Sequence, residues 1–416
     1  MQESSTRDRR RSRQLLSRFV GFSLLPFIAI LSPFLILPVL ARSVTRPEWA
    51  ALGIGQSVGA AASIAIIFGW SLTGPSRVAR SELLERRLIY AESMATRIVL
   101  LVLVVPAACL VTLWLVPPDE SWYGTSMTVA MSLGGLSVAW YAIGAGRPRD
   151  IALFELLPRL LTTVAALYLL VAFDWVITYP ALISVGSITG FCLYSRRVLG
   201  AEGLSVLRSI DLRRVFRTQF SAATTESAGA AYSTSAVAVV GATATIGEVA
   251  AYSSGDRLYR MSLLSISALS NSFQGWVAEG HSSDLGYRAR KALMAHFILG
   301  ASGAIMISAI GPWVSMIMFG RDLAVDGVTA DALALAFLAV SLNTTLGRHV
   351  LVPALRTRTV LVSTLAGALV GVPTIAVGAA MWGAGGGAAE LALSQITVFV
   401  CQVPSSVPIL FKRLSA

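Results

Sequence analysis

Residues 98–117 read IVLLVLVVPAACLVTLWLVP, a run of twenty residues without a charged side chain. An α-helix of about 20 apolar residues crosses the hydrocarbon core of a bilayer. Arg97 precedes this run, and Asp119 and Glu120 follow it, so the charges gather at its two ends. The run predicts a transmembrane helix, because lipid offers no hydrogen-bond partner to a backbone group left outside a helix or a closed barrel.

The same pattern recurs along the whole chain. Of its 416 residues 55% are hydrophobic and 13% are charged, whereas soluble proteins carry about 25% charged residues. The apolar runs are long and unbroken, which favours helices over the short alternating segments of a barrel. We therefore expect an all-α polytopic membrane protein with about twelve transmembrane helices. The expected spans are 19–41, 49–72, 98–117, 122–145, 151–173, 176–195, 219–241, 248–273, 292–319, 331–353, 359–381 and 388–410.

Arginine is distributed unevenly over the links between these spans. With the N-terminus inside, the inner segments hold 26 of the 33 basic residues, and the outer links hold only Arg42, Arg46 and Arg321. Basic residues concentrate in cytoplasmic loops. The distribution predicts that both termini are cytoplasmic. It also explains the net charge of +11 without a nucleic-acid partner.

Two short matches indicate an internal repeat. Glu48-Trp-Ala-Ala-Leu-Gly-Ile-Gly55 resembles Glu248-Val-Ala-Ala-Tyr-Ser-Ser-Gly255, and Arg147-Pro-Arg149 resembles Arg356-Thr-Arg358. They predict two six-helix lobes of equal orientation, related by an axis along the membrane normal. The expected parts are a basic N-terminus (1–18), an N-terminal lobe (19–195), a linker (196–218), a C-terminal lobe (219–410) and a C-terminal tail (411–416).

Motifs of catalysis and cofactor binding are missing from the sequence. It has no Gly-x-x-x-x-Gly-Lys-Ser/Thr loop for a nucleotide. Its three histidines, His281, His296 and His349, form no pair with metal-ligand spacing on one helix. We expect no catalytic residue, no metal and no cofactor, and hence no enzyme.

Charged residues inside the expected spans are the candidates for function. A charge at the bilayer centre costs about 2.5–3.5 kcal/mol, so it faces a cavity or a partner. The span 248–273 carries Asp256, Arg257 and Arg260, and Asp256 and Arg260 share one helix face. This stripe has a net positive charge, which an anionic substrate would match, although a purely structural pair is the alternative.

Two sets of intramembrane charges follow from this reasoning. The expected cationic substrate path is Arg159, Arg257, Arg260 and Arg348, and the acids that could couple an ion or pair with these arginines are Glu155, Glu226, Asp256 and Glu390. Alternatives remain for several of them. Arg348 could extend to the membrane interface, Glu155 and Arg159 could pair only with each other, and Glu226 could pair across the bundle or carry a proton.

The chain resembles the multidrug/oligosaccharidyl-lipid/polysaccharide (MOP) superfamily in its two six-helix halves without an ATPase. The link Leu40–Gly53 resembles the start of Wzx-type polysaccharide flippases, and Gly247–Leu258 resembles that family's G-x-Y-x-x-A-x-R-L pattern. In the latter Tyr252, Arg257 and Leu258 fit the pattern. Pro353–Arg358 looks like the family's short basic inner turn.

This resemblance implies a V-shaped, MATE-like fold in the bacterial plasma membrane. It implies a flippase that moves undecaprenyl-diphosphate-linked oligosaccharide to the outer leaflet by alternating access, for cell-surface polysaccharide biosynthesis. Membrane lipid, a polysaccharide polymerase and glycosyltransferases would be its partners. A cation-coupled exporter of the multidrug type is the alternative. A membrane-embedded glycosyltransferase is a third class, which would need a larger outer loop than any found here.

Overall fold

The computed structural model describes residues 36–200, 210–278 and 285–411, which form helices and short links without a strand. The expected all-α fold is confirmed. In this part of the chain seven helical segments are long and apolar enough to cross a membrane, and the chain is a multi-pass membrane protein. The expected N-terminus 1–18, most of the first span 19–41, and residues 412–416 lie outside the described residues.

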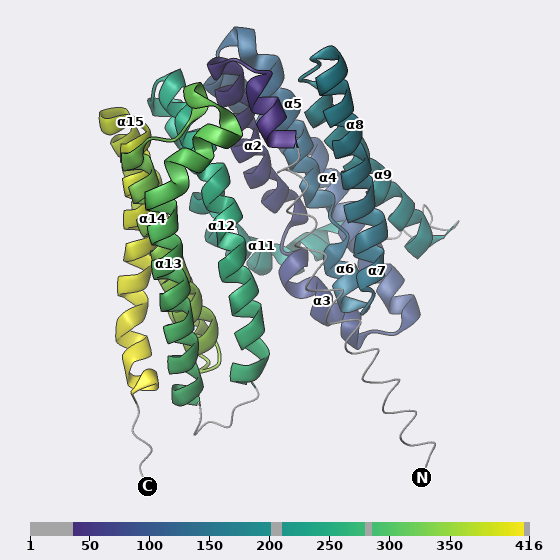
Figure 1. The fold of residues 1–416 in the computed structure, drawn as a ribbon. Coiled ribbons are helices and arrows are strands. Elements are labelled where there is room, and N and C mark those ends of the chain that lie inside the picture. Colours follow the sequence, from purple (N-terminus) through teal and green to yellow (C-terminus); the bar gives the residue numbers. More distant parts are fainter. Residues whose placement is uncertain (1–35, 201–209, 279–284, 412–416) are drawn as a thin grey trace, which may run out of the picture. The chain divides into compact units, whose positions relative to one another are not determined.

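Every expected span from the second to the twelfth falls on helical structure (Figure 1). The α-helices are α2 (Arg46–Ile67), α3 (Trp70–Arg80), α4 (Leu83–Leu115), α5 (Ser121–Ser132), α6 (Ala139–Gly144), α7 (Pro148–Ile151), α8 (Leu157–Phe173), α9 (Thr178–Leu199), α11 (Leu212–Thr243), α12 (Ile246–Ala278), α13 (Leu285–Phe319), α14 (Gly327–Thr345) and α15 (Thr357–Leu410). Short 3₁₀ or π turns are η1 (Pro118–Glu120), η2 (Leu133–Leu136), η3 (Ala152–Leu156), η4 (Arg321–Leu323) and η5 (Leu346–Leu351).

Several helices begin earlier than the apolar runs predict. Helix α4 begins at Leu83 rather than at residue 98, and its 33 residues span about 50 Å at 1.5 Å per residue. The hydrocarbon core is only about 30 Å thick, so the polar first turns extend the helix beyond it. Arg97 therefore lies within α4, although it precedes the apolar run.

Two expected spans are interrupted. The span 49–72 is broken between α2 and α3, where Phe68 and Gly69 have positive φ. The span 122–145 is broken between η2 and α6, where Ser137 and Val138 leave the helix. Helix α15 contains non-helical dihedral angles at Trp382 and Gly383, where φ of Gly383 is +60°. A positive φ favours glycine because it lacks a Cβ atom. This kink separates the eleventh and twelfth expected spans.

Contacts within the described residues divide the chain into two compact units. Unit 1 holds the described parts of Met1–Ser43, Val58–Leu113 and Thr125–Ser227, and unit 2 holds Val44–Ser57, Trp114–Gly124 and the described parts of Ala228–Ala416. Helix α2 thus contributes to both units. The two six-helix lobes remain a prediction.

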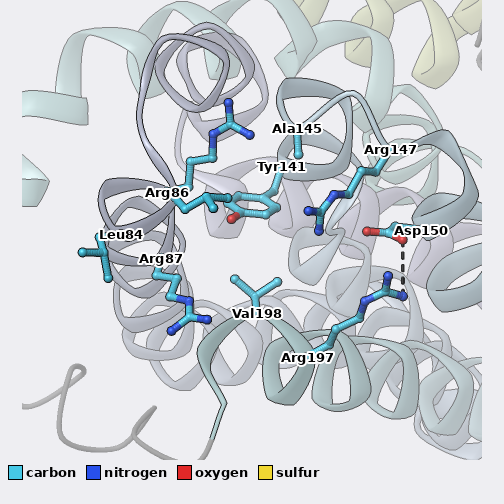
Figure 2. Close-up of a pocket in the computed structure, with 10 residues that line it drawn as sticks. Leu84, Arg86, Arg87, Tyr141, Ala145, Arg147, Asp150, Arg197 and Val198 are labelled. Atoms are coloured by element: carbon cyan, nitrogen blue, oxygen red, sulfur yellow. Dashed lines mark ion pairs between the residues drawn. The ribbon is translucent and has the colours of Figure 1, made fainter.

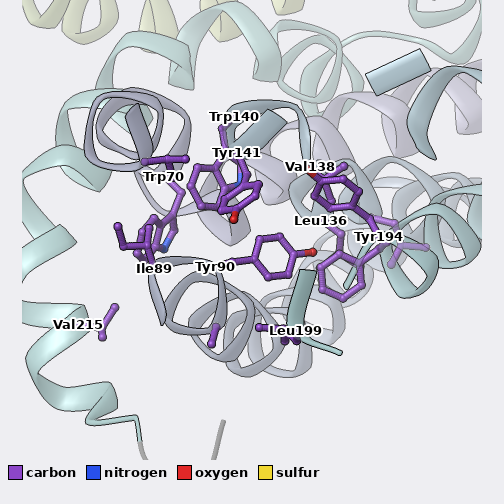
Figure 3. Packing of buried hydrophobic residues seen from close by; sticks show 14 residues of the cluster. Trp70, Ile89, Tyr90, Leu136, Val138, Trp140, Tyr141, Tyr194, Leu199 and Val215 are labelled. Carbon is purple, nitrogen blue, oxygen red and sulfur yellow. The ribbon is translucent and has the colours of Figure 1, made fainter. Parts of the chain in front are cut away.

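In unit 1, α8 packs on α9 and α3 packs on α6. Its core is rich in aromatic rings, as Figure 3 shows for Trp70, Tyr90, Trp140, Tyr141 and Tyr194. The rings of Tyr90 and Tyr141 meet edge to face with their centroids 5.1 Å apart, a favoured geometry for aromatic pairs. In unit 2, α14 packs between α13 and α15, and α12 packs against α13 and α14 (Figure 1).

Candidate functional site

The two copies of the repeated motif lie against each other in unit 2. Each copy begins with a glutamate that stands three residues after a threonine, at the beginning of a helix. The Thr45 N–H donates to Glu48 Oε2 at 2.7 Å, and the Glu248 N–H donates to Thr245 Oγ1 at 3.4 Å, which are the bonds of a capping box. The sequence match therefore marks the beginnings of α2 and α12.

Small residues bring these two helix segments close together. A Cβ atom added at Gly53 would lie 2.8 Å from Ser253 Cβ, closer than two carbon atoms can pack. One turn away, Trp49 Nε1 donates to Ser254 Oγ at 2.9 Å, and both side chains are buried. Glycine at position 53 is thus what allows the first part of α2 to contact α12 along its length.

Arg257 is held in this contact. Only 4% of its surface is exposed, its guanidinium carbon lies 3.7 Å from the centroid of a Trp49 ring, and its Nε donates to Gln56 Oε1 at 3.3 Å. Stacking on tryptophan stabilises a desolvated cation by about 2 kcal/mol. Trp49 lies in the first repeat copy and Gln56 directly follows it, whereas Arg257 lies two residues beyond the second copy.

Asp256 and Arg260 form an ion pair next to Arg257. Arg260 Nε donates to Asp256 Oδ2 at 2.5 Å, across one helical turn of α12. The Asp256 side chain is 6% exposed, whereas that of Arg260 is 31% exposed. The structure thus assembles a stripe of a stacked guanidinium and an ion pair, in which Arg260 is the cation most accessible to a ligand.

The other predicted residues of unit 2 lie in different surroundings. Arg348 lies in the π turn η5, is exposed, and donates to Ser270 Oγ at 3.4 Å and Asn271 Oδ1 at 3.3 Å. Glu390 lies on the second half of α15 against Gly378. Its Oε2 is buried and has no hydrogen-bond partner among the described residues.

Glu155 and Arg159 line one pocket of about 250 Å³ in unit 1. Within the described residues they form no ion pair, and the π turn η3 at 152–156 alters the helical spacing that would align them. Glu155 instead accepts from the Ala139 N–H at 2.9 Å, from the Val138 N–H, and from Ser137 Oγ at 2.7 Å. It thereby caps α6 at the break in the span.

Arg97 binds the carbonyl groups on the other side of the same break. Its surface is fully buried, and its guanidinium donates to the carbonyl oxygens of Ser137 at 2.8 Å and Gly135 at 3.3 Å. Sequence reasoning missed it, because the apolar run begins only after it. The signal that was available is the spacing of Ile89, Ser93 and Arg97, which recur every four residues and are all buried on one face of α4.

Glu226 also lies in unit 1, on α11. Ser71 Oγ on α3 donates to its Oε1, and its Oε2 is buried without a hydrogen-bond partner among the described residues. The predicted charges therefore fall into separate groups: Asp256, Arg257 and Arg260 share one site, Glu155 and Arg159 share a second, and Glu226 has its own surroundings.

No protein-family model and no curated protein sequence matches this chain. Solved structures do. An inward-facing multidrug resistance transporter of the MATE family, in the MOP superfamily, is 12% identical with a TM-score of 0.66, and the match covers 94% of this chain and 99% of that one. The lipid II flippase MurJ in an inward closed conformation is 12% identical with a TM-score of 0.67, and the match covers 94% of this chain and 89% of that one.

A MATE structure in a bent conformation is 14% identical with a TM-score of 0.57, and the match covers 94% of this chain and 95% of that one. At these identities the similarity concerns the fold. The chain has the all-α fold of MOP superfamily transporters, as expected from its sequence.

Proposed function

We propose that this protein is a flippase for undecaprenyl-diphosphate-linked oligosaccharide, which it moves from the cytoplasmic to the outer leaflet of the bacterial plasma membrane. The observation that carries the proposal is the arginine stripe of α12, in which Arg257 is stacked on Trp49 beside the partly exposed Arg260. A guanidinium matches the geometry of phosphate oxygens and forms strong charge-assisted hydrogen bonds with them.

The fold accommodates transporters of different substrates. One structure with this fold is a lipid II flippase, and others are multidrug transporters of the MATE family. A buried, aromatic-stacked arginine favours an anionic cargo over a cationic one, because like charges in a medium of low dielectric constant repel strongly. In this proposal transport proceeds by alternating access, and the transported repeat units are used for the synthesis of surface polysaccharide.

The test is deletion of the gene followed by complementation. Deletion should abolish surface polysaccharide and leave lipid-linked repeat units on the inner leaflet, and the wild-type gene should reverse both effects. Arg260→Ala should reduce surface polysaccharide about tenfold or more, the loss expected for one charge-assisted phosphate contact. Arg358→Ala is the matched control, because Arg358 is an exposed arginine outside the stripe.

Two results of this test would overturn the flippase proposal. One is that deletion leaves both surface polysaccharide and the lipid-linked pool unchanged. The other is that Arg260→Ala, inserted in the membrane at the wild-type level, supports full surface polysaccharide.

A cation-coupled small-molecule exporter is the second candidate. It is favoured by Glu226 and Glu390, each of which has one buried carboxylate oxygen without a hydrogen-bond partner among the described residues. Buried acids of this kind carry protons or bind cations in transporters. In proteoliposomes, an exporter would transport cationic dyes when a proton or sodium gradient drives it, and Glu390→Gln would abolish that transport. A flippase of the proposed kind would show no dye efflux.

A further inference from the structure

Four arginines converge on one cavity in unit 1, away from the charges considered so far. The cavity has a volume of about 410 Å³, and Figure 2 shows Arg87, Arg147 and Arg197 around the opening beside Tyr141. Leu83, Leu84 and Asp150 also line it. We call this cavity the arginine pocket.

The arginines of this pocket come from three separate places in the chain. Arg86 and Arg87 lie in the first turns of α4, Arg147 lies in the link between α6 and α7, and Arg197 lies in the last turn of α9. Gly146 precedes Arg147 with φ of +67°, a conformation in which glycine avoids the strain of a Cβ atom. All of these segments belong to the side that arginine counting assigns to the cytoplasm.

Among the described residues, Asp150 is the only acid that lines the pocket, and it is already engaged. Asp150 is buried, lies 3.4 Å from an Arg197 nitrogen, and accepts from the Tyr194 hydroxyl at 3.4 Å (Figure 2). Four arginines and one aspartate give the described lining a formal charge of +3. Arg87 and Arg147 are exposed, so their charges are accessible to a ligand.

One side of the pocket is formed by a tightly packed aromatic side chain, and leucines lie at its rim. Tyr141 belongs to the aromatic core of unit 1, where its ring meets Trp140 and Tyr194 edge to face (Figure 3). At the rim Leu83 is 69% and Leu84 is 80% exposed. Large leucines exposed beside arginines are typical of a segment at the boundary between lipid and water, where the leucines enter the apolar layer.

We infer that the arginine pocket binds a phosphate-bearing anion. A guanidinium group donates two parallel hydrogen bonds to the oxygens of a phosphate group. Four guanidinium groups around one cavity are therefore suited to a phosphate ester or a diphosphate. The volume of about 410 Å³ lies within the range of small-molecule sites and exceeds the need of a single small ion. This assignment does not rest on the flippase activity, since it concerns residues of unit 1 that the proposed function does not use.

The phosphate could belong to a lipid headgroup or to a soluble compound, and one experiment separates these sources. Purified full-length protein in phosphatidylcholine nanodiscs is titrated with inorganic pyrophosphate in a calorimeter. The test variant is Arg87→Gln/Arg147→Gln. Its matched control is Arg149→Gln/Arg196→Gln, which removes two exposed arginines near the pocket that do not line it.

We expect pyrophosphate to bind the wild type, with the dissociation constant raised about tenfold or more in the test variant and less than about twofold in the control. Arg87→Lys/Arg147→Lys retains the charge but not the planar guanidinium, so its affinity for pyrophosphate should lie between those of the wild type and the glutamine variant. Should the glutamine variant fail to fold, the lysine variant alone gives the comparison.

Repeating the titration with phosphatidylglycerol in the nanodiscs identifies the source. Weaker pyrophosphate binding, caused by competition, assigns the pocket to a lipid headgroup, and unchanged binding assigns it to a soluble phosphate compound. The inference is overturned when the wild type does not bind pyrophosphate in phosphatidylcholine nanodiscs. It is equally overturned when the control variant loses as much affinity as the test variant, because the effect is then one of overall charge.

Discussion

Replacing Gly53 by alanine tests whether the two repeat copies owe their contact to a missing side chain. The new Cβ atom would lie 2.1 Å from Ser253 Oγ and 2.8 Å from Ser253 Cβ. The hydroxyl can rotate away, but the Cβ atom cannot, so α2 and α12 must separate by about 1 Å to reach an ordinary carbon–carbon contact of about 3.8 Å. That shift would stretch the Trp49–Ser254 hydrogen bond of 2.9 Å.

The size of the effect follows from two opposing contributions. Overpacking of a closed contact costs about 1–3 kcal/mol. Alanine gains about 1 kcal/mol over glycine in a helix, so the net loss in the free energy of unfolding is about 0–2 kcal/mol. Adding Ser253→Gly removes both close contacts and leaves only Val237 Cγ1 at 3.5 Å, an ordinary distance. The coupling energy between positions 53 and 253 should therefore be about 1–3 kcal/mol.

The assay is unfolding by sodium dodecyl sulfate in mixed micelles, followed by circular dichroism, for both single variants and the double variant. Gly247→Ala is the control, since nothing lies within 4 Å of a Cβ atom at that position of α12. It should be neutral or slightly stabilising. A coupling energy below about 0.5 kcal/mol, with Gly53→Ala as stable as Gly247→Ala, would refute the close approach of the two helices.

The other three predictions use the same unfolding assay. Trp49→Phe should lower the free energy of unfolding by about 1 kcal/mol, because the hydrogen bond to Ser254 is lost. Trp49→Leu should lower it by about 2 kcal/mol more, because the stacking on Arg257 is also lost. Equal stability of the two variants would contradict the stacking. Arg97→Ala should lower the free energy of unfolding by about 2–6 kcal/mol, because it leaves two buried carbonyl oxygens without a donor at about 1–3 kcal/mol each. A loss under about 1 kcal/mol would show that the broken span does not need this guanidinium. Glu155→Ala should cost about 1 kcal/mol and Glu155→Gln less, since glutamine still accepts from the first N–H groups of α6; the opposite order would exclude the capping role.

Apolar runs located most of the membrane helices because the cost of an unpaired backbone group in lipid acts on each segment separately. The run 388–410 and the second half of α15 agree to within a few residues. The beginnings of α4, α11 and α13 were missed, since their polar and basic first turns lie where lipid no longer selects apolar side chains. Hydropathy alone cannot distinguish such turns from loops.

Of the candidate site, the sequence identified the residues of α12 but not what holds them. The spacing of Asp256 and Arg260 predicts a shared helix face, and the structure forms their ion pair. The stacking of Arg257 on Trp49 joins residues far apart in the chain, and it depends on how closely α2 approaches α12. Glu155 and Arg159 have the same spacing but form no ion pair within the described part of the chain, because a π turn intervenes and the break before α6 provides N–H groups for Glu155.

The sequence by itself determined that this is an all-α membrane protein, because twenty apolar residues in lipid have essentially one way to satisfy their backbone. It also marked the two helix beginnings of the repeat, because a capping box is a local structure. Only the tertiary structure revealed the break served by Arg97 and Glu155, and the convergence of Arg86, Arg87, Arg147 and Arg197 on one cavity. Both depend on packing between segments distant in sequence. The spacing of Ile89, Ser93 and Arg97 marks a buried face of α4, but it does not identify the segment that packs against this face.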